Sequence, residues 1–81
     1  MNMNNIEKLN RIFCDTFSCE ESALGDGFDK CSVDGWDSVR QLSLIAAVED
    51  TFDIMLDAED IIEFSSYANA KNILKKYDIE L

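Results

Sequence analysis

Apolar side chains recur at steps of three and four residues in two long stretches, a spacing that predicts two amphipathic helices. The first helix is expected over residues 4–18, with its apolar face made of Ile6, Leu9, Ile12, Phe13 and Phe17. The second is expected over residues 37–53. Its stripe consists of Val39, Leu42, Ile45, Val48 and Phe52, broadened by Leu44, Ala46 and Ala47.

Capping residues mark the beginnings of the helices. Asn4 can cap the first helix, with Glu7 three positions later. Asp57 and the acidic turn after it favour a short third helix over residues 57–64. Ser65 or Ser66 can cap a last helix that extends through Tyr77. Its inward face is expected to hold Ala70, Ile73, Leu74 and Tyr77, with Lys71, Lys75 and Lys76 toward its end.

Residues 19–36 have no sustained period and contain all three glycines, which indicates a long loop with room for one short helical turn. Leu24, Phe28 and Val33 are expected to hold this loop on the core. The predicted fold is therefore all-α. It is a small bundle of three main helices plus one short helix, with a long loop between helices one and two, in a single domain over residues 1–81.

Composition narrows the function. The 81 residues include 17 acidic and 7 basic side chains, a net charge of −10 that repels phosphate backbones and anionic lipid surfaces. We therefore expect protein partners with basic patches, no nucleic acid and no stable membrane insertion. The absence of histidine removes the usual general base and any Ser-His or Cys-His pair, which disfavours an enzyme.

The sequence contains few other signals of localisation or chemistry. Residues 1–5 have neither a basic segment nor an apolar stretch, so a cytoplasmic protein is expected. The cysteines Cys14, Cys19 and Cys31 are odd in number and lack C-x-x-C spacing, which indicates reduced thiols. No calcium-loop pattern occurs among the aspartates, and no metal site is expected.

Seven acids and no base lie between positions 41 and 70: Glu49, Asp50, Asp53, Asp57, Glu59, Asp60 and Glu63. This run is either a solvated face that keeps a small protein soluble or a docking strip for cationic partners. The sequence does not separate these two interpretations.

The junction between the long loop and the second helix is the most informative stretch. If Ser38 is the N-cap, Gln41 three residues later completes a capping box. If Asp37 is the cap instead, the Ser38 hydroxyl projects freely from the first turn. Trp36, just before this junction, is expected to anchor the loop in the core rather than to stack on a ligand.

The triplet Asp37, Ser38 and Val39 resembles the D-S-L signature of acyl carrier proteins. The pattern continues through residues 35–54, and the likeness in length, acidity and helix order spans most of the chain. The resemblance implies that a phosphopantetheinyl transferase attaches 4′-phosphopantetheine from coenzyme A covalently to Ser38, while Asp37 assists by helping to place magnesium. The arm then holds an acyl group as a thioester for fatty-acid, polyketide or related lipid biosynthesis, and the carrier itself catalyses nothing.

The resemblance also implies a partner-binding surface on the second helix, with Val39, Arg40, Glu49, Asp50 and Asp53 as its candidate residues. The expected partners of this monomer are acyl-loading, synthase or transferase enzymes with basic patches. Val39 in place of leucine, Arg40 in place of an acid or glycine, and the preceding Trp36 favour a specialised pathway. Two alternatives stay open: an aminoacyl carrier of the peptidyl or D-alanyl kind, and a non-enzymatic acidic adaptor in which Ser38 is only a helix cap.

Overall fold

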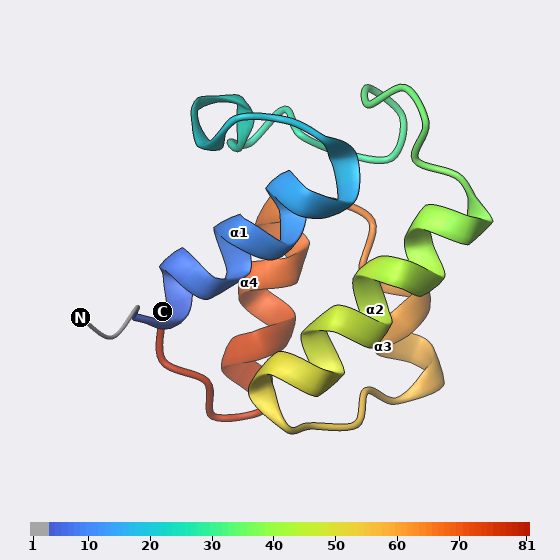
Figure 1. Cartoon of the computed structure of the whole chain (residues 1–81). Coiled ribbons are helices and arrows are strands. Elements are labelled where there is room, and N and C mark those ends of the chain that lie inside the picture. The colour runs from blue at the N-terminus through green and yellow to red at the C-terminus, as the bar shows by residue number, and fades with distance from the viewer. Residues whose placement is uncertain (1–3) are drawn as a thin grey trace.

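The computed structural model describes residues 4–81, which contain four α-helices and one 3-10 turn (Figure 1). The elements are α1 (Asn5–Phe17), η1 (Glu21–Ala23), α2 (Ser38–Phe52), α3 (Ala58–Glu63) and α4 (Tyr67–Lys76). The all-α fold with three main helices, one short helix and a long first loop is confirmed. No helix within residues 4–81 has both the length and the apolar character needed to cross a membrane.

The helix ends follow the capping signals. Asn4 accepts a hydrogen bond of 2.9 Å from the Glu7 backbone N–H at the start of α1, as predicted. At α4 the sequence left two serines open, and the structure selects Ser66, whose hydroxyl accepts the Asn69 N–H at 2.9 Å. These contacts pair backbone donors that the first turn of a helix leaves free.

An aromatic cluster fills the centre of the core. Phe13 of α1 is fully buried, and its ring contacts those of Phe17, Phe28, Trp36, Phe64 and Tyr67. The cluster joins α1 to the long loop and to the junction between α3 and α4. One side chain thus connects segments that lie far apart in the sequence.

The long loop crosses one end of the bundle in Figure 1 and is fastened to the α3–α4 junction. Lys30 donates its N–H to the Ser65 carbonyl at 2.8 Å, and Tyr67 donates to the Phe28 carbonyl at 2.9 Å. Phe28 is buried, whereas the other two predicted anchors, Leu24 and Val33, are half-buried. These contacts give an irregular segment a defined path up to the start of α2.

The predicted apolar stripe of α2 is wrong at its first two positions. Val39 and Leu42 are 72% and 66% exposed, and Ala46 is exposed as well. The inward face contains Leu44, Ile45 and Val48, and the half-buried Gln41 occupies the same face one turn earlier. The polar Gln41 thus lies on the inward face, where the apolar pattern predicted Leu42.

Asp60 is likewise not part of a solvated acidic face, because it is only 2% exposed. Its carboxylate accepts hydrogen bonds from Lys76 Nζ at 2.7 Å and from the Tyr77 hydroxyl at 2.6 Å. These bonds hold the pKa of Asp60 below its ordinary 3.8, and they raise the pKa values of Lys76 and Tyr77. The network thereby joins α3 to the end of α4.

Candidate functional site

The start of α2 adopts the register in which Asp37 is the cap. Asp37 has extended backbone, and its Oδ1 accepts the Arg40 N–H at 2.9 Å, while its carbonyl accepts the Gln41 N–H at 2.9 Å. Ser38 is the first helical residue. The interpretation of Ser38 as N-cap with a Gln41 capping box is therefore wrong, because the carboxylate one residue earlier already fills the cap.

Ser38 is exposed, and among residues 4–81 its hydroxyl has no hydrogen-bond partner. The Asp37 cap pairs the Arg40 N–H, so the N–H groups of Ser38 and Val39 lie at the open end of the helix. These groups and the aligned peptide dipoles favour a negative charge at this position. A free hydroxyl therefore lies next to backbone that stabilises an anion.

The turn before Ser38 is held firmly. Gly35 adopts φ of +85°, a left-handed conformation that glycine reaches without a steric penalty. The Asp37 N–H then bonds to the Gly35 carbonyl at 3.0 Å. Trp36 is 5% exposed and contacts the rings of Phe13, Phe17 and Phe28, which confirms it as a core anchor.

Gln41 links this turn to the end of α3. Its Oε1 accepts the Trp36 indole N–H at 2.6 Å, and its Nε2 donates to the carbonyls of Ile61 and Phe64, both at 2.9 Å. Sequence reasoning assigned Gln41 only to a capping box and missed this role. The available signal was its position, because Gln41 precedes Leu44 and Ile45 by three and four residues and so shares their face.

Arg40, a predicted partner-binding residue, is exposed but also makes an internal bond. Its Nη1 donates to the Thr16 carbonyl in the last turn of α1 at 2.8 Å. A cation at the carbonyl end of a helix is favourable for the helix dipole. Arg40 therefore ties the first turn of α2 to α1, whereas its neighbour Val39 projects into solvent without such a bond.

The three acids predicted for the far end of α2 differ in what they do. Glu49 is half-buried, and its Oε2 accepts the Leu56 N–H at 2.8 Å. Asp53 ends the helix with φ of 54°. Asp50 is exposed. The three acids thus have different roles. Glu49 and Asp53 shape the connection to α3, and Asp50 has its side chain on the surface.

An apolar strip borders Ser38. Leu42 lies one helical turn after Ser38 on the same side of α2, and Val39 follows Ser38 directly. Two more large apolar side chains are exposed, Met55 in the connection between α2 and α3 and Ile62 on α3. Neighbouring exposed apolar side chains such as Val39 and Leu42 are typical of a surface that meets other proteins.

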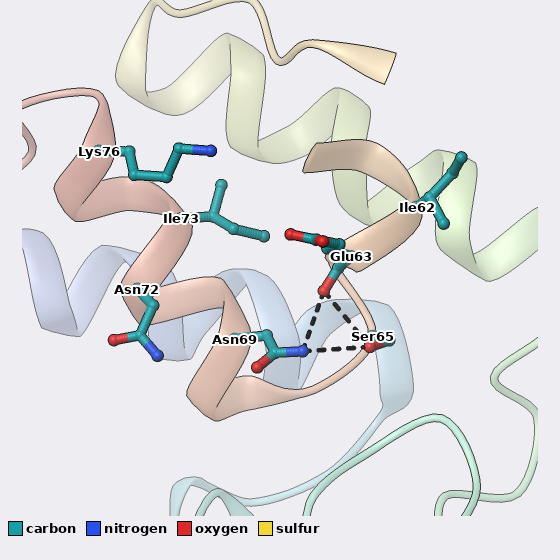
Figure 2. A pocket seen from close by; sticks show the side chains of 7 residues that line it. All are labelled: Ile62, Glu63, Ser65, Asn69, Asn72, Ile73 and Lys76. Atoms are coloured by element: carbon teal, nitrogen blue, oxygen red, sulfur yellow. Dashed lines mark hydrogen bonds between the residues drawn. The ribbon is translucent and has the colours of Figure 1, made fainter. Parts of the chain in front are cut away.

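A groove lies between α3 and α4; Ile62 lines it, but Ser38, Val39 and Leu42 do not (Figure 2). It has a volume of about 520 Å³ and is lined by Ile62, Glu63, Ser65, Asn69, Asn72, Ile73 and Lys76. In Figure 2 the Asn69 side chain reaches from α4 to the Glu63 carbonyl and the Ser65 hydroxyl, at 3.2 and 3.3 Å. Among residues 4–81 no group of three or more histidine, cysteine, aspartate or glutamate side chains could hold a metal ion.

Comparisons with protein-family models, with curated proteins and with solved structures find no match to this chain. The best candidate site in the described chain is the exposed Ser38 hydroxyl. The Asp37 cap leaves this hydroxyl unpaired, and Trp36, Gln41 and Arg40 fix the backbone around it.

Proposed function

We propose that this chain is an acyl carrier protein that carries 4′-phosphopantetheine, derived from coenzyme A, on Ser38. One observation carries the proposal. The cap of α2 is Asp37, so Ser38 presents an exposed hydroxyl at the positive end of the helix. Within residues 4–81 this hydroxyl has no hydrogen-bond partner. The signature of Asp37, Ser38 and Val39, together with the acidic helical fold, supports the same function.

The residues present fit such an attachment. A phosphodiester on Ser38 would lie beside the open N–H groups of Ser38 and Val39, which favour its negative charge. Within residues 4–81, Asp37 caps the helix through Oδ1 and not through Oδ2, so Oδ2 would be available to assist the magnesium that a transferase brings. When attached, the arm supplies a terminal thiol that holds an acyl group as a thioester.

The chain lacks the side chain that most often acts as a catalytic base. It contains no histidine, and activation of a serine hydroxyl requires a base or a metal ion nearby. We therefore assign the base and the magnesium to a phosphopantetheinyl transferase. The chain presents the hydroxyl and holds it still, and it catalyses nothing itself.

We assign partner contacts to the exposed Val39 and Leu42 beside Ser38, with Asp50 as an exposed acid on the same helix. Acyl-loading, synthase or transferase enzymes with basic patches suit this surface, since opposite charges steer encounter. Arg40 and Val39 favour a specialised pathway over the housekeeping fatty-acid synthase. An aminoacyl cargo is the alternative within the same class.

The second hypothesis is a non-enzymatic acidic adaptor in which Ser38 is only a helix cap. Ser38 is not the cap, because the Asp37 side chain occupies that position. The net charge of −10 is compatible with either function. The two hypotheses differ in what they require of the Ser38 hydroxyl.

A pair of serine variants separates them. Ser38→Ala and Ser43→Ala each remove one exposed hydroxyl from α2, and neither is expected to change the free energy of unfolding by more than about 0.5 kcal/mol. With a transferase, magnesium and a fluorescent coenzyme A derivative, the wild type and Ser43→Ala should become labelled, and Ser38→Ala should not. Equal labelling of both variants would contradict the proposal, as would an unlabelled wild type.

A further inference from the structure

The end of α1 brings two cysteines together. Ser18 adopts φ of 53°, which turns the chain back so that both Ser18 and Cys19 donate their N–H groups to the Cys14 carbonyl, the latter at 3.2 Å. In this type of helix ending, the side chains at the two ends of the turn pack against each other. The backbone bond also keeps the two Cα atoms within about 7 Å, the upper end of the range that a disulfide spans.

The turn places the two cysteine side chains on the same side of the helix end. Cys19 Sγ donates a hydrogen bond to the carbonyl of Phe13, the residue directly before Cys14, at 3.9 Å. Both cysteines are half-buried. Cys31 is exposed and lies in the long loop, outside this pair.

We propose that Cys14 and Cys19 form a reversible dithiol–disulfide site that small-molecule disulfides oxidise. The site is independent of any modification of Ser38. Its basis is the left-handed turn at Ser18, the backbone bond from Cys19 to Cys14, and the bond from Cys19 Sγ to the Phe13 carbonyl beside Cys14.

The two sulfurs differ in the order in which they react. Burial first, and then the charge and hydrogen bond of Cys19, raise the pKa of Cys14 to about 11, so Cys14 stays protonated at neutral pH. Cys19 releases its proton to solvent and attacks the small disulfide, forming a mixed disulfide and expelling one small thiolate, which takes up a proton.

Cys14 then releases its proton to solvent, attacks the Cys19 sulfur and expels the second small thiolate, which takes up a proton. Two protein thiols become one disulfide, and one small disulfide becomes two small thiols. The product fixes the turn at Ser18. That turn follows the Thr16 carbonyl that holds Arg40, so oxidation rigidifies the end of α1 that contacts α2.

The test uses the whole chain of 81 residues with Cys31→Ser, which leaves only Cys14 and Cys19 as thiols. After incubation with oxidised glutathione, intact mass should show a loss of about 2 Da in the monomer, reversed by dithiothreitol. A stable glutathione adduct, disulfide-linked dimers or no reaction in the folded protein would each overturn the proposal. Circular dichroism establishes that the variant is folded.

Two further variants report the order of attack. With Cys14→Ser added, the reaction should stop at one glutathione adduct on Cys19. With Cys19→Ser added instead, adduct formation on Cys14 should be slower, by up to about tenfold, since less of a thiol with a raised pKa is ionised. Equal adduct rates in the two variants would overturn the assigned order.

Discussion

Replacing Gln41 with methionine removes one side chain's three hydrogen bonds at nearly constant volume. The Trp36 indole N–H and the Phe64 carbonyl then lose their partner in buried surroundings, whereas the half-buried Ile61 carbonyl keeps its second bond, from the Phe64 N–H at 3.3 Å. Each hydrogen bond contributes about 1 kcal/mol net, and a buried donor left unpaired costs about 1–3 kcal/mol. Because the apolar methionine side chain offsets part of this loss, we expect the free energy of unfolding to fall by about 2–4 kcal/mol.

A loss of this size is large for a chain of 81 residues, whose total stability is expected to be about 4–12 kcal/mol. It corresponds to a decrease in Tm of roughly 10–30 °C. Urea unfolding followed by fluorescence measures the loss directly, because Trp36 is the sole tryptophan and bonds to Gln41 itself. Asn72→Met is the matched control, since Asn72 is an exposed amide on α4 and its loss should cost no more than about 0.5 kcal/mol.

The charged variant Gln41→Glu tests the direction of the bonds. A carboxylate still accepts from Trp36 but faces the carbonyls of Ile61 and Phe64 without a donor. Protonation restores one donor, so the deficit relative to the wild type should narrow as the pH falls below about 5. A Gln41→Met variant as stable as the Asn72→Met control, or a Gln41→Glu deficit that does not change with pH, would refute this account of Gln41.

The remaining predictions concern the core, the buried acid and the surface. Phe13→Ala should destabilise the chain by about 3–5 kcal/mol in urea unfolding, because it empties the centre of the aromatic cluster; a loss under 1 kcal/mol would contradict that placement. The stabilisation from the Asp60 carboxylate is present above its ordinary pKa of 3.8 and is lost as the pH falls through the lowered folded pKa. Asp60→Asn should therefore lower Tm at pH 7 and flatten the decrease of Tm below pH 4, whereas an unchanged acid slope would count against the network. Val39→Asp should leave Tm within a few degrees of the wild type and slow the labelling of Ser38 at limiting transferase; unchanged labelling would remove Val39 from the partner surface.

Local signals predicted most of the secondary structure. The cap at Asn4 depends on a side chain and a backbone N–H three residues apart, so it was readable from the sequence. The same holds for α4, where only the choice between Ser65 and Ser66 required the structure. The position of Trp36 in the core also followed from its size and its place before a helix.

Contacts between distant segments were not predictable in this way. Gln41 faces the core because its amide satisfies the end of α3, twenty or more positions along the chain. Asp60 is buried because Lys76, at the end of α4, and Tyr77, directly after it, donate hydrogen bonds to its carboxylate. A periodicity rule treats polar residues as exposed, so it fails where a distant partner satisfies the polar group.

The candidate site was half determined by the sequence. The pattern placed Ser38 at a helix start but allowed either Asp37 or Ser38 as the cap. The choice depended on backbone geometry, in which an extended Asp37 follows the left-handed Gly35. Arg40 and Glu49 were expected on a partner surface, and their internal bonds to Thr16 and Leu56 became visible only in three dimensions.

The central claim is that the Ser38 hydroxyl is the attachment point of a phosphopantetheine arm. The most direct test incubates the folded chain with coenzyme A, magnesium and several phosphopantetheinyl transferases, and then records intact mass and fragment spectra. We expect the wild type to gain one phosphopantetheine, located on Ser38, and Ser38→Ala to gain nothing. No mass gain with any transferase, or the same gain in Ser38→Ala, would contradict the claim.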